Sequence, residues 1–162
     1  MIKIISGAQT GVDCAVLDIA IKFKIPYTGY IPLDGNDKLS AQQLIKQYPK
    51  LLCTNSPIHN VRTALNVLNG DIFINIVPTG YISEGTDFGI DFLKALQKPY
   101  INITNLSYLD IEKCKKWLSK NTQIKKETIL GVGGPSEIQF PEIYNKSYKF
   151  FDAILKKYRN NF

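Results

Sequence analysis

Short apolar runs alternate along this chain with longer segments in which apolar residues recur every three or four positions. The runs are rich in β-branched and aromatic residues and are bounded by glycine, proline or polar residues, which predicts buried strands. The predicted strands cover residues 2–5, 27–31, 51–53, 71–77, 100–103 and 128–132. The periodic segments predict helices over residues 12–23, 41–47, 57–68, 87–96 and 107–119, and a terminal helix that Pro141 opens. This alternation predicts βαβ units and a mostly parallel sheet.

Length and composition agree with an α/β fold. The chain has 162 residues, of which 44% are hydrophobic and 21% charged, as is ordinary for a folded protein. We expect a single domain over residues 1–162, built as a Rossmann-like three-layer sandwich. No segment approaches the ~20 apolar residues of a membrane span, and residues 1–5 are too short an apolar run for a signal peptide. A cytoplasmic protein without a membrane partner is therefore expected.

Local signals predict where two of the helices begin or end and what the last helix contacts. Ser56 and Pro57 predict a helix start, with serine as the N-cap and proline at the first helical position. Gly70 predicts the end of that helix. The terminal helix carries an apolar stripe, which predicts contact with either the core or another subunit. The stripe consists of Tyr144, Tyr148, Phe151, Leu155 and Tyr158.

The net charge of +6 comes from 20 Lys and Arg residues against 14 Asp and Glu residues. Much of the excess lies late in the chain, in Lys113, Lys115, Lys116, Lys120, Lys125, Lys126, Lys146, Lys149, Lys156, Lys157 and Arg159. No nucleic-acid-binding motif accompanies these residues, so no nucleic-acid partner is predicted. Solvated helix faces are the simplest interpretation, and a positive field that attracts a small anion is the alternative.

The cysteines and the single histidine form no reactive or metal-binding pattern. Cys14, Cys53 and Cys114 are scattered and lack a C-x-x-C pair, so neither a zinc site nor a disulfide framework is predicted. Reduced, buried thiols are expected instead. His59 has no G-x-S-x-G nucleophile motif to serve, and a capping or solvent-facing histidine is expected.

Three glycine-rich loops lie near the carboxyl ends of predicted strands. Two come at the end of a strand, and the other lies just before the helix that follows a strand. They are residues 6–11, 83–86 and 131–135. Because parallel strands end at the same edge of a sheet, these loops should meet where α/β proteins bind ligands. The third loop contributes Gly133 and Gly134 to the predicted site.

The first loop has the chemistry of an anion-binding turn. It matches neither the G-x-G-x-x-G fingerprint nor the P-loop. Its glycines nevertheless let backbone N–H groups approach an anion, and the N-terminus of the following helix adds partial positive charge. A tight strand-to-helix turn without a ligand is the alternative. The residues predicted to contact a ligand here are Gly7, Ala8, Gln9, Thr10, Gly11 and Asp13.

Two further segments supply candidate contacts. Glu84, Gly85 and Thr86 repeat the logic of the first loop, with Thr86 either capping the next helix or donating to a phosphate. Arg62 and Asn66 are four residues apart, so they should share one helix face. A guanidinium can hold a phosphate through two hydrogen bonds, which makes Arg62 the predicted clamp, although a surface arginine is the alternative.

At these residues the sequence resembles the molybdenum cofactor carrier family, in the circularly permuted branch of the Rossmann-like SLOG superfamily. The family opening S-G-G-Q-T-G-V-D-R-A-A-L-D is similar to residues 6–18 here. Further matches run in the family's order through residues 29–32, 48–49, 62–63, 66–67, 71, 85–86, 134–135, 137, 141 and 143–144. The resemblance implies a Rossmann-like fold, a homo-oligomer such as a dimer or tetramer, and a ligand such as the molybdenum cofactor or a nucleotide derivative.

The chain also departs from the family pattern at charged positions. Cys14 and Ser136 stand where the family usually has arginine, and residues 33–35 replace a basic stretch. Glu84 stands at a usual glycine, as Ala8 does in the first loop. Three expected cationic sites are thus missing and one carboxylate is added, which favours a less anionic, nucleotide-derived ligand.

Three functions are consistent with these residues. The first is binding of a phosphate-bearing, nucleotide-like small molecule without turnover, as a carrier or as a protein that senses or sequesters a nucleotide-derived signal in bacterial or phage defence. The second is a phosphoribohydrolase-like enzyme that cleaves a nucleoside monophosphate. Related enzymes carry Gly-Gly-x-Gly-Thr-x-x-Glu, but Gly89 occupies the glutamate position here, so Glu84 or Asp87 would have to act as acid or base. The third is a structural or interaction module.

Overall fold

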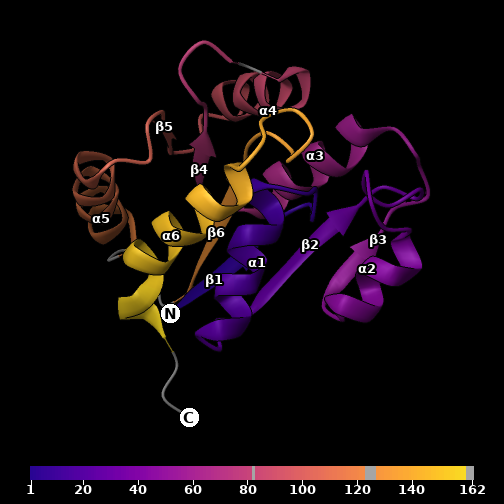
Figure 1. Ribbon diagram of the computed structural model, residues 1–162, viewed down its shortest axis with the longest axis horizontal. Coiled ribbons are helices and arrows are strands. Elements are labelled where there is room, and N and C mark those ends of the chain that lie inside the picture. Colours follow the sequence, from indigo (N-terminus) through magenta and orange to yellow (C-terminus); the bar gives the residue numbers. More distant parts are fainter. Residues whose placement is uncertain (82, 123–126, 160–162) are drawn as a thin grey trace.

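The computed structural model describes residues 1–81, 83–122 and 127–159, and its strands form one sheet. The six strands are all parallel and lie in the order β3-β2-β1-β6-β4-β5 (Figure 1). Their bounds are β1 Ile2–Ile5, β2 Tyr27–Ile31, β3 Leu51–Cys53, β4 Ile72–Ile76, β5 Tyr100–Ile103 and β6 Thr128–Gly133. This arrangement confirms the predicted Rossmann-like α/β class, with a sheet that is wholly parallel.

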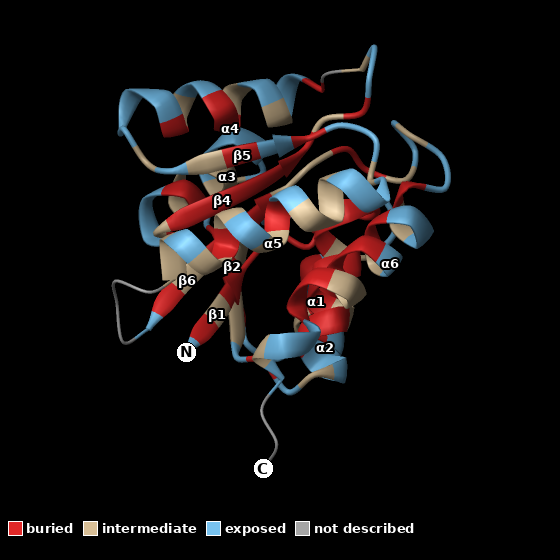
Figure 2. Cartoon of the chain, turned by 90° about the vertical axis from the view of Figure 1, so that its left-hand side faces the viewer, coloured by how far each residue is buried: buried red, intermediate tan, exposed pale blue. Residues whose placement is uncertain are grey.

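Helices cover both faces of the sheet. They are α1 Val12–Lys22, α2 Ala41–Gln47, α3 His59–Asn69, α4 Glu84–Ala95, α5 Tyr108–Thr122 and α6 Ile143–Leu155, followed by a short 3-10 turn at Lys156–Tyr158. One layer contains α1, α5 and α6, whose side chains share a core cluster with the sheet, and α2 packs beside α1. The opposite layer contains α3 and α4 (Figures 1 and 2).

Strand β4 shows how one short sequence serves both layers. All five of its residues are buried, and the strand is red along its length in Figure 2. Its isoleucines belong to the core cluster beneath α1 and α6. Because side chains alternate along a strand, Phe73 and Asn75 point to the other face, where Phe73 packs with Val67 and Leu93 of α3 and α4.

Three predicted helix starts are wrong by two or three residues. Helix α6 begins at Ile143 and not at Pro141, because Glu142 is its N-cap. Helix α3 begins at His59 and its N-cap is Ile58, because the Ser56 hydroxyl accepts the Ile58 N–H at 3.1 Å in a tighter local turn. Helix α4 begins at Glu84, three residues before the predicted start, because Ser83 is its N-cap. The Ser83 hydroxyl accepts the Thr86 N–H at 3.1 Å, so Thr86 does not cap the helix.

Two other predictions concern buried side chains. The terminal stripe contacts the core, with Phe151 and Leu155 buried and the three tyrosines packed against the same cluster. The cysteines are only partly as predicted, since Cys114 is buried but Cys53 is exposed on the edge strand β3.

Within the described residues no helix is long and apolar enough to cross a membrane. Of the basic residues that were expected on solvated helix faces, Lys125 and Lys126 lie outside the described part of the chain.

The strand order changes direction near the centre of the sheet. The chain runs from β1 outward to β3, then crosses to β4 and β5 on the other side before β6 fills the central position. Loops that leave the carboxyl ends of β1, β4 and β6 therefore converge at this point, which is where parallel sheets generally bind ligands.

Candidate functional site

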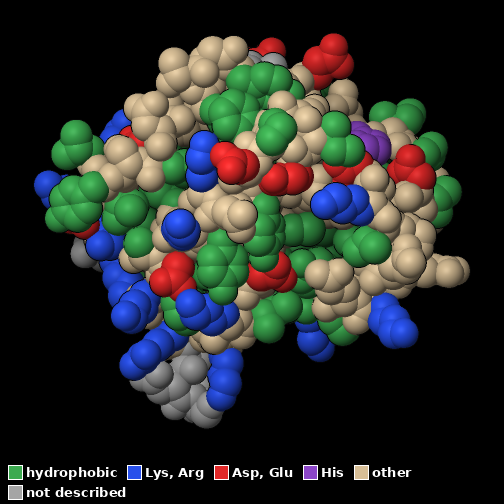
Figure 3. Space-filling view, in the orientation of Figure 1, with side chains coloured by type: hydrophobic (Ala, Val, Ile, Leu, Met, Phe, Trp, Pro, Cys, Tyr) green, Lys and Arg blue, Asp and Glu red, His purple; other side chains and the backbone are tan. Residues whose placement is uncertain are grey.

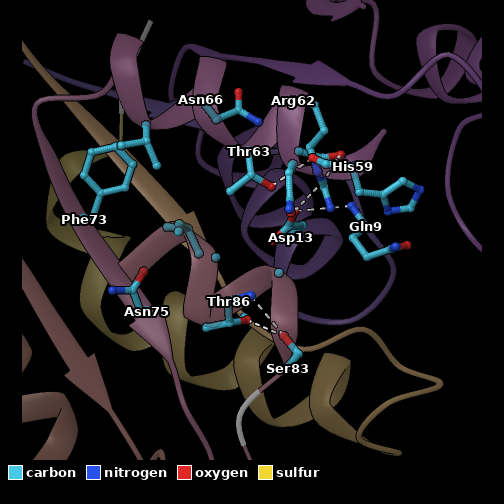
Figure 4. Close-up of a pocket in the computed structure, with 18 of the residues that line it drawn as sticks. Gln9, Asp13, His59, Arg62, Thr63, Asn66, Phe73, Asn75, Ser83 and Thr86 are labelled. Carbon is cyan, nitrogen blue, oxygen red and sulfur yellow. Dashed lines mark hydrogen bonds and ion pairs between the residues drawn. The ribbon is translucent and has the colours of Figure 1, made fainter. Parts of the chain in front are cut away.

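A cavity of about 310 Å³ lies at this convergence, between the sheet and the helices α3 and α4 (Figure 4). Its walls come from the loop after β1, from α3, from the start of α4, from β4 and from the loop after β6. The lining residues are Ile5, Gly7, Gln9, Asp13, His59, Asn60, Arg62, Thr63, Asn66, Val67, Phe73, Asn75, Ser83, Glu84, Gly85, Thr86, Gly89, Leu93, Val132, Gly133, Gly134 and Gln139.

The structure brings most of the predicted contacts together around this one cavity. From the sequence prediction, the cavity contains Gly7, Gln9, Asp13, Arg62, Asn66, Glu84, Gly85, Thr86, Gly133 and Gly134. Ala8, Thr10 and Gly11 of the first loop do not line it. Asp87, a predicted acid or base, also lies outside the lining and is exposed on α4.

The residues of the first loop that miss the cavity have structural roles. The Thr10 hydroxyl donates to the Asp37 carboxylate at 2.8 Å and accepts the Glu137 N–H at 3.2 Å, so it ties the first loop to the third. Gly11 has a φ of +84° and lies against backbone atoms of Pro135 and Glu137, where a Cβ would clash. Ala8 is buried at a φ of 54°. These contacts shape the loop from outside the cavity lining.

The side chain of Arg62 extends from α3 to the first loop, where its guanidinium packs against Gly7. Its Nη1 donates to the Gly7 carbonyl oxygen at 3.0 Å, and a Cβ on Gly7 would overlap the guanidinium. Gly7 is thus required by the arginine that packs on it, in addition to any approach of an anion. From the sequence, the need for glycine at this position was explained only by the tight turn and by the approach of an anion to the backbone.

Arg62 is also paired with a carboxylate inside the protein. Its Nη1 lies 3.6 Å from Oδ2 of Asp13, and the two side chains are only 12% and 7% exposed. Burial raises the pKa of Asp13, while Arg62 and backbone N–H groups, including that of Gln9, act in the opposite direction. Burial likewise lowers the pKa of Arg62. The predicted phosphate clamp therefore has its charge balanced before any ligand arrives.

The start of α4 presents backbone donors to the cavity. Ser83 satisfies the Thr86 N–H, and its hydroxyl also donates to the Thr86 hydroxyl at 2.7 Å. The N–H groups of Glu84 and Gly85 belong to the first turn, where an α-helix has no internal acceptor and the helix dipole is positive. Both residues line the cavity, and a Cβ on Gly85 would meet nothing within 4 Å.

The deep end of the cavity is apolar and was missed by the sequence analysis. Four apolar side chains line it, from Ile5, Val67, Phe73 and Leu93, while the Val132 side chain belongs to the core cluster on the other face of the sheet. Asn75 adds one amide, whose Nδ2 donates to Oδ1 of Asn102 at 3.0 Å. Figure 4 shows Phe73 and Asn75 on the side away from Gln9, Arg62 and His59. Alternation along residues 72–76 would have indicated that both side chains share one face of the sheet.

Two residues of α3 that line the cavity differ in whether their side chains are held by hydrogen bonds to the rest of the protein. Asn66 donates to the Tyr30 carbonyl oxygen at 3.0 Å and accepts the Tyr30 N–H at 2.8 Å, so its amide is used in attaching α3 to β2. His59 is exposed at the rim, 3.8 Å from an oxygen of Asp34, in agreement with the expected solvent-facing histidine. The spacing that placed Arg62 and Asn66 on one helix face is confirmed.

Gly89 occupies a position of particular interest on α4. It lines the cavity, and the nearest atom to an added Cβ would be Cγ2 of Thr63 at 3.4 Å. In the phosphoribohydrolase motif to which this segment was compared, the same position holds the catalytic glutamate. Here the position faces the cavity without a functional group. In the described part of the chain, no three His, Cys, Asp or Glu side chains are grouped to hold a metal ion.

The fold and the cavity define a Rossmann-like α/β protein with a small-molecule-sized pocket at the carboxyl edge of its sheet. A model of the circularly permuted YpsA SLOG family matches residues 4–155. The chain belongs to this family, as its resemblance predicted.

A crystal structure from Syntrophus aciditrophicus SB, of a protein named as a candidate molybdenum carrier, has a similar fold. The two sequences are 31% identical, the comparison covers 94% of each chain, and the TM-score is 0.78. Among curated proteins, no significant match was found.

Proposed function

We propose that this chain binds a phosphate-bearing, nucleotide-like small molecule in the cavity and does not turn it over. The observation that carries the proposal is the convergence of three glycine-rich loops and α3 on one cavity. Its volume of about 310 Å³ is at the lower end of small-molecule sites. Membership of the SLOG family and the name of the Syntrophus relative support a small-molecule ligand.

The two ends of the cavity suit the two ends of a nucleotide. The apolar end around Phe73 offers a flat surface for a base, with the Asn75 amide at its edge. The first turn of α4 offers backbone N–H groups to a phosphate. Within the described atoms, the buried Nε–H of Arg62 has no acceptor, and a ligand oxygen would supply one.

Charge limits the kind of anion that the cavity accepts. Among the described residues that line the cavity, the ionisable ones other than His59 are Asp13, Arg62 and Glu84, and none is a lysine. Asp13 balances Arg62, which leaves the carboxylate of Glu84 as the remaining charge. We therefore propose a ligand with one phosphate group, such as a nucleotide derivative, in preference to the more anionic molybdenum cofactor.

Calorimetry against nucleoside monophosphates, cyclic nucleotides, ADP-ribose derivatives and pterins tests the proposal. We expect micromolar to millimolar binding of a monophosphate-bearing compound and loss of that binding in Thr86→Val combined with Gly85→Pro, which removes one hydroxyl and one N–H donor. Failure of every compound to bind at millimolar concentration would refute the proposal.

One observation favours an enzyme as a second candidate. Glu84 lines the cavity, so a carboxylate is available there as a general acid or base for hydrolysis of the N-glycosidic bond of a nucleoside monophosphate. In that reaction water would add to the sugar carbon and the base would leave with a proton. Release of free base from nucleoside monophosphates, and its loss in Glu84→Gln with binding retained, would support this candidate over simple binding.

A further inference from the structure

A row of three residues in register crosses the sheet at the apolar end of the cavity. Asn102 of β5 pairs with Asn75 of β4, and Asn75 pairs with Gly133 of β6. Residues paired in this way point to the same face of the sheet, which here is the face that α3 and α4 cover. Asn75 and Gly133 line the cavity, whereas Asn102 lies outside the lining and is exposed on the edge strand.

The Asn75 side chain has one end of its amide held and the other end open. Its Nδ2 donates to Oδ1 of Asn102 at 3.0 Å, which turns the nitrogen toward the edge of the sheet. Among the described residues, no donor is hydrogen-bonded to Oδ1 of Asn75. The side chain is buried, and Figure 4 shows its oxygen turned toward the other labelled lining residues. The cavity therefore contains a fixed hydrogen-bond acceptor, which is costly to leave unpaired.

The floor of the cavity beside Asn75 has room for a flat ring. The Phe73 ring lies over Gly131 of β6, since a Cβ on that glycine would overlap the ring. Gly133 lies two residues further along the same strand and points to the same face. A Cβ on Gly133 would meet nothing within 4 Å, so the floor is open there. A planar ring over Gly133 would have the Phe73 ring on one side and its edge toward Asn75.

Charge does not discriminate between rings at this end of the cavity. Basic side chains gather on the other face of the sheet, over the lower part of α6 (Figure 3). The four apolar side chains and the Asn75 amide that line the deep end are uncharged. Recognition of a ring here must therefore depend on shape and on hydrogen bonds.

We propose that Asn75 selects ligands whose ring carries an amino group at the edge that meets its side-chain oxygen. This selection rests on the proposed function and narrows it to amino-bearing bases. The amino group would donate one hydrogen to Oδ1 of Asn75, while Nδ2 stays bonded to Asn102. A ring that lacks the donor leaves the buried oxygen unpaired, which is how a polar site rejects a close analogue. Asn102 is a positioning residue, because it keeps the amide from turning over.

Calorimetry with pairs of monophosphates that differ at the amino group tests this selection. AMP is compared with purine riboside monophosphate, CMP with pyrimidin-2-one riboside monophosphate, and GMP with IMP. The amino-bearing member of at least one pair should bind about tenfold more tightly, the effect of roughly one net hydrogen bond. Equal affinity within every pair would overturn the selection and leave the proposed function intact. Absence of binding by all of these compounds would overturn both.

Three variants assign the preference to the amide and its orientation. Asn75→Leu replaces the amide by an apolar side chain of similar size and should bind both members of a pair alike. Asn102→Asp still offers an oxygen to Nδ2 of Asn75 and should keep the preference. Asn102→Leu frees the amide to turn over and should lose most of the preference. A preference that persists in Asn75→Leu, or that disappears in Asn102→Asp, would overturn the assignment.

Gly133→Ala is the matched control for the floor of the cavity. Its added methyl group has space in the protein but would lie where the ring is expected. This variant should weaken both members of a pair to the same extent, so that their ratio of affinities is unchanged. A changed ratio would show that the preference comes from the shape of the floor and would overturn the role of Asn75. Circular dichroism verifies that all four variants are folded.

Discussion

At the scale of single residues, the balance between Asp13 and Arg62 decides how much charge the cavity offers. The two groups lie 3.6 Å apart and are almost fully buried. A buried ion pair stabilises the fold little more than apolar side chains of the same size would. Removing only one partner is strongly destabilising, because the other charge then stays buried without a counter-charge. The pair is therefore a sensitive point for both stability and binding.

Arg62→Met should lower the free energy of unfolding at neutral pH by about 3–5 kcal/mol, since it leaves the Asp13 carboxylate without its counter-charge. Burial already raises the pKa of Asp13, and loss of Arg62 raises it further. A carboxyl whose folded pKa exceeds its unfolded value of about 3.9 contributes most stability when protonated. The deficit should therefore shrink as the pH falls from about 7 to about 5, as measured by urea unfolding.

Removing both charges provides the control for this prediction. Arg62→Met combined with Asp13→Asn should recover much of the lost stability and abolish its dependence on pH. An equal deficit of the single variant at both pH values would show that Asp13 is not the group that titrates.

Gly89 permits a cleaner separation of binding from stability. Gly89→Ala should stabilise the protein by about 0.5–1 kcal/mol, because alanine is the better helix residue, and its Cβ would make an ordinary 3.4 Å contact with Thr63. Gly89→Leu should fill the cavity and abolish ligand binding while the protein remains folded. Calorimetry combined with thermal unfolding compares the two variants. Unchanged affinity in Gly89→Leu would place the ligand elsewhere.

At the scale of secondary-structure elements, one carboxylate joins three helices. Asp18 on α1 accepts the Tyr48 hydroxyl of the α2 C-cap at 2.8 Å and the Tyr144 hydroxyl of α6 at 2.6 Å. Burial raises the pKa of both phenols, and the hydrogen bonds to Asp18 contribute in the same direction. This junction holds α2 and α6 against the helix that follows the first loop.

Tyr48→Phe should lower the free energy of unfolding by about 1.5–3 kcal/mol, because it removes a hydrogen bond to a charged group in a buried site. The effects of Tyr48→Phe and Tyr144→Phe should be non-additive, since both hydroxyls bind the same carboxylate. A double-mutant cycle by chemical denaturation measures this coupling. Tyr108→Phe is the matched control, because Tyr108 is 74% exposed on α5, and it should change nothing. Strict additivity would mean that the two bonds are independent.

Element order and type followed from the sequence because each strand and helix has a distinct apolar period. Element ends were less predictable where side-chain hydrogen bonds compete. At α3, Ser56 bonds the Ile58 N–H in a local turn, and the helix begins only after it. At α4, Ser83 and Thr86 are both suitable caps by residue type, and the geometry selects Ser83.

At the scale of the whole molecule, topology made the site predictable and side-chain direction limited the prediction. Parallel strands bring the loops of β1, β4 and β6 to one edge, so the glycine-rich segments could be placed together. No sequence signal showed that Asp13 would face Arg62, or that Thr10 would bind Asp37 instead of facing the cavity. The apolar end around Phe73 depends on packing between two layers, which residue types alone do not specify.

The remaining charge of the cavity leads to a prediction about the ligand. A nucleoside monophosphate at about 100 times its Kd should stabilise the protein by about 2.7 kcal/mol, which raises the Tm of a chain of this size by about 5–10 °C. The corresponding triphosphate should give a smaller shift at equal concentration, because Glu84 repels the added charge and no lysine is among the described residues that line the cavity. Thermal unfolding of the wild type and of Glu84→Gln, each with either ligand, shows which of the two ligands gives the larger Tm shift. If the triphosphate bound more tightly to the wild type, positive groups outside the described lining would have to dominate, and the single-phosphate ligand class would be wrong.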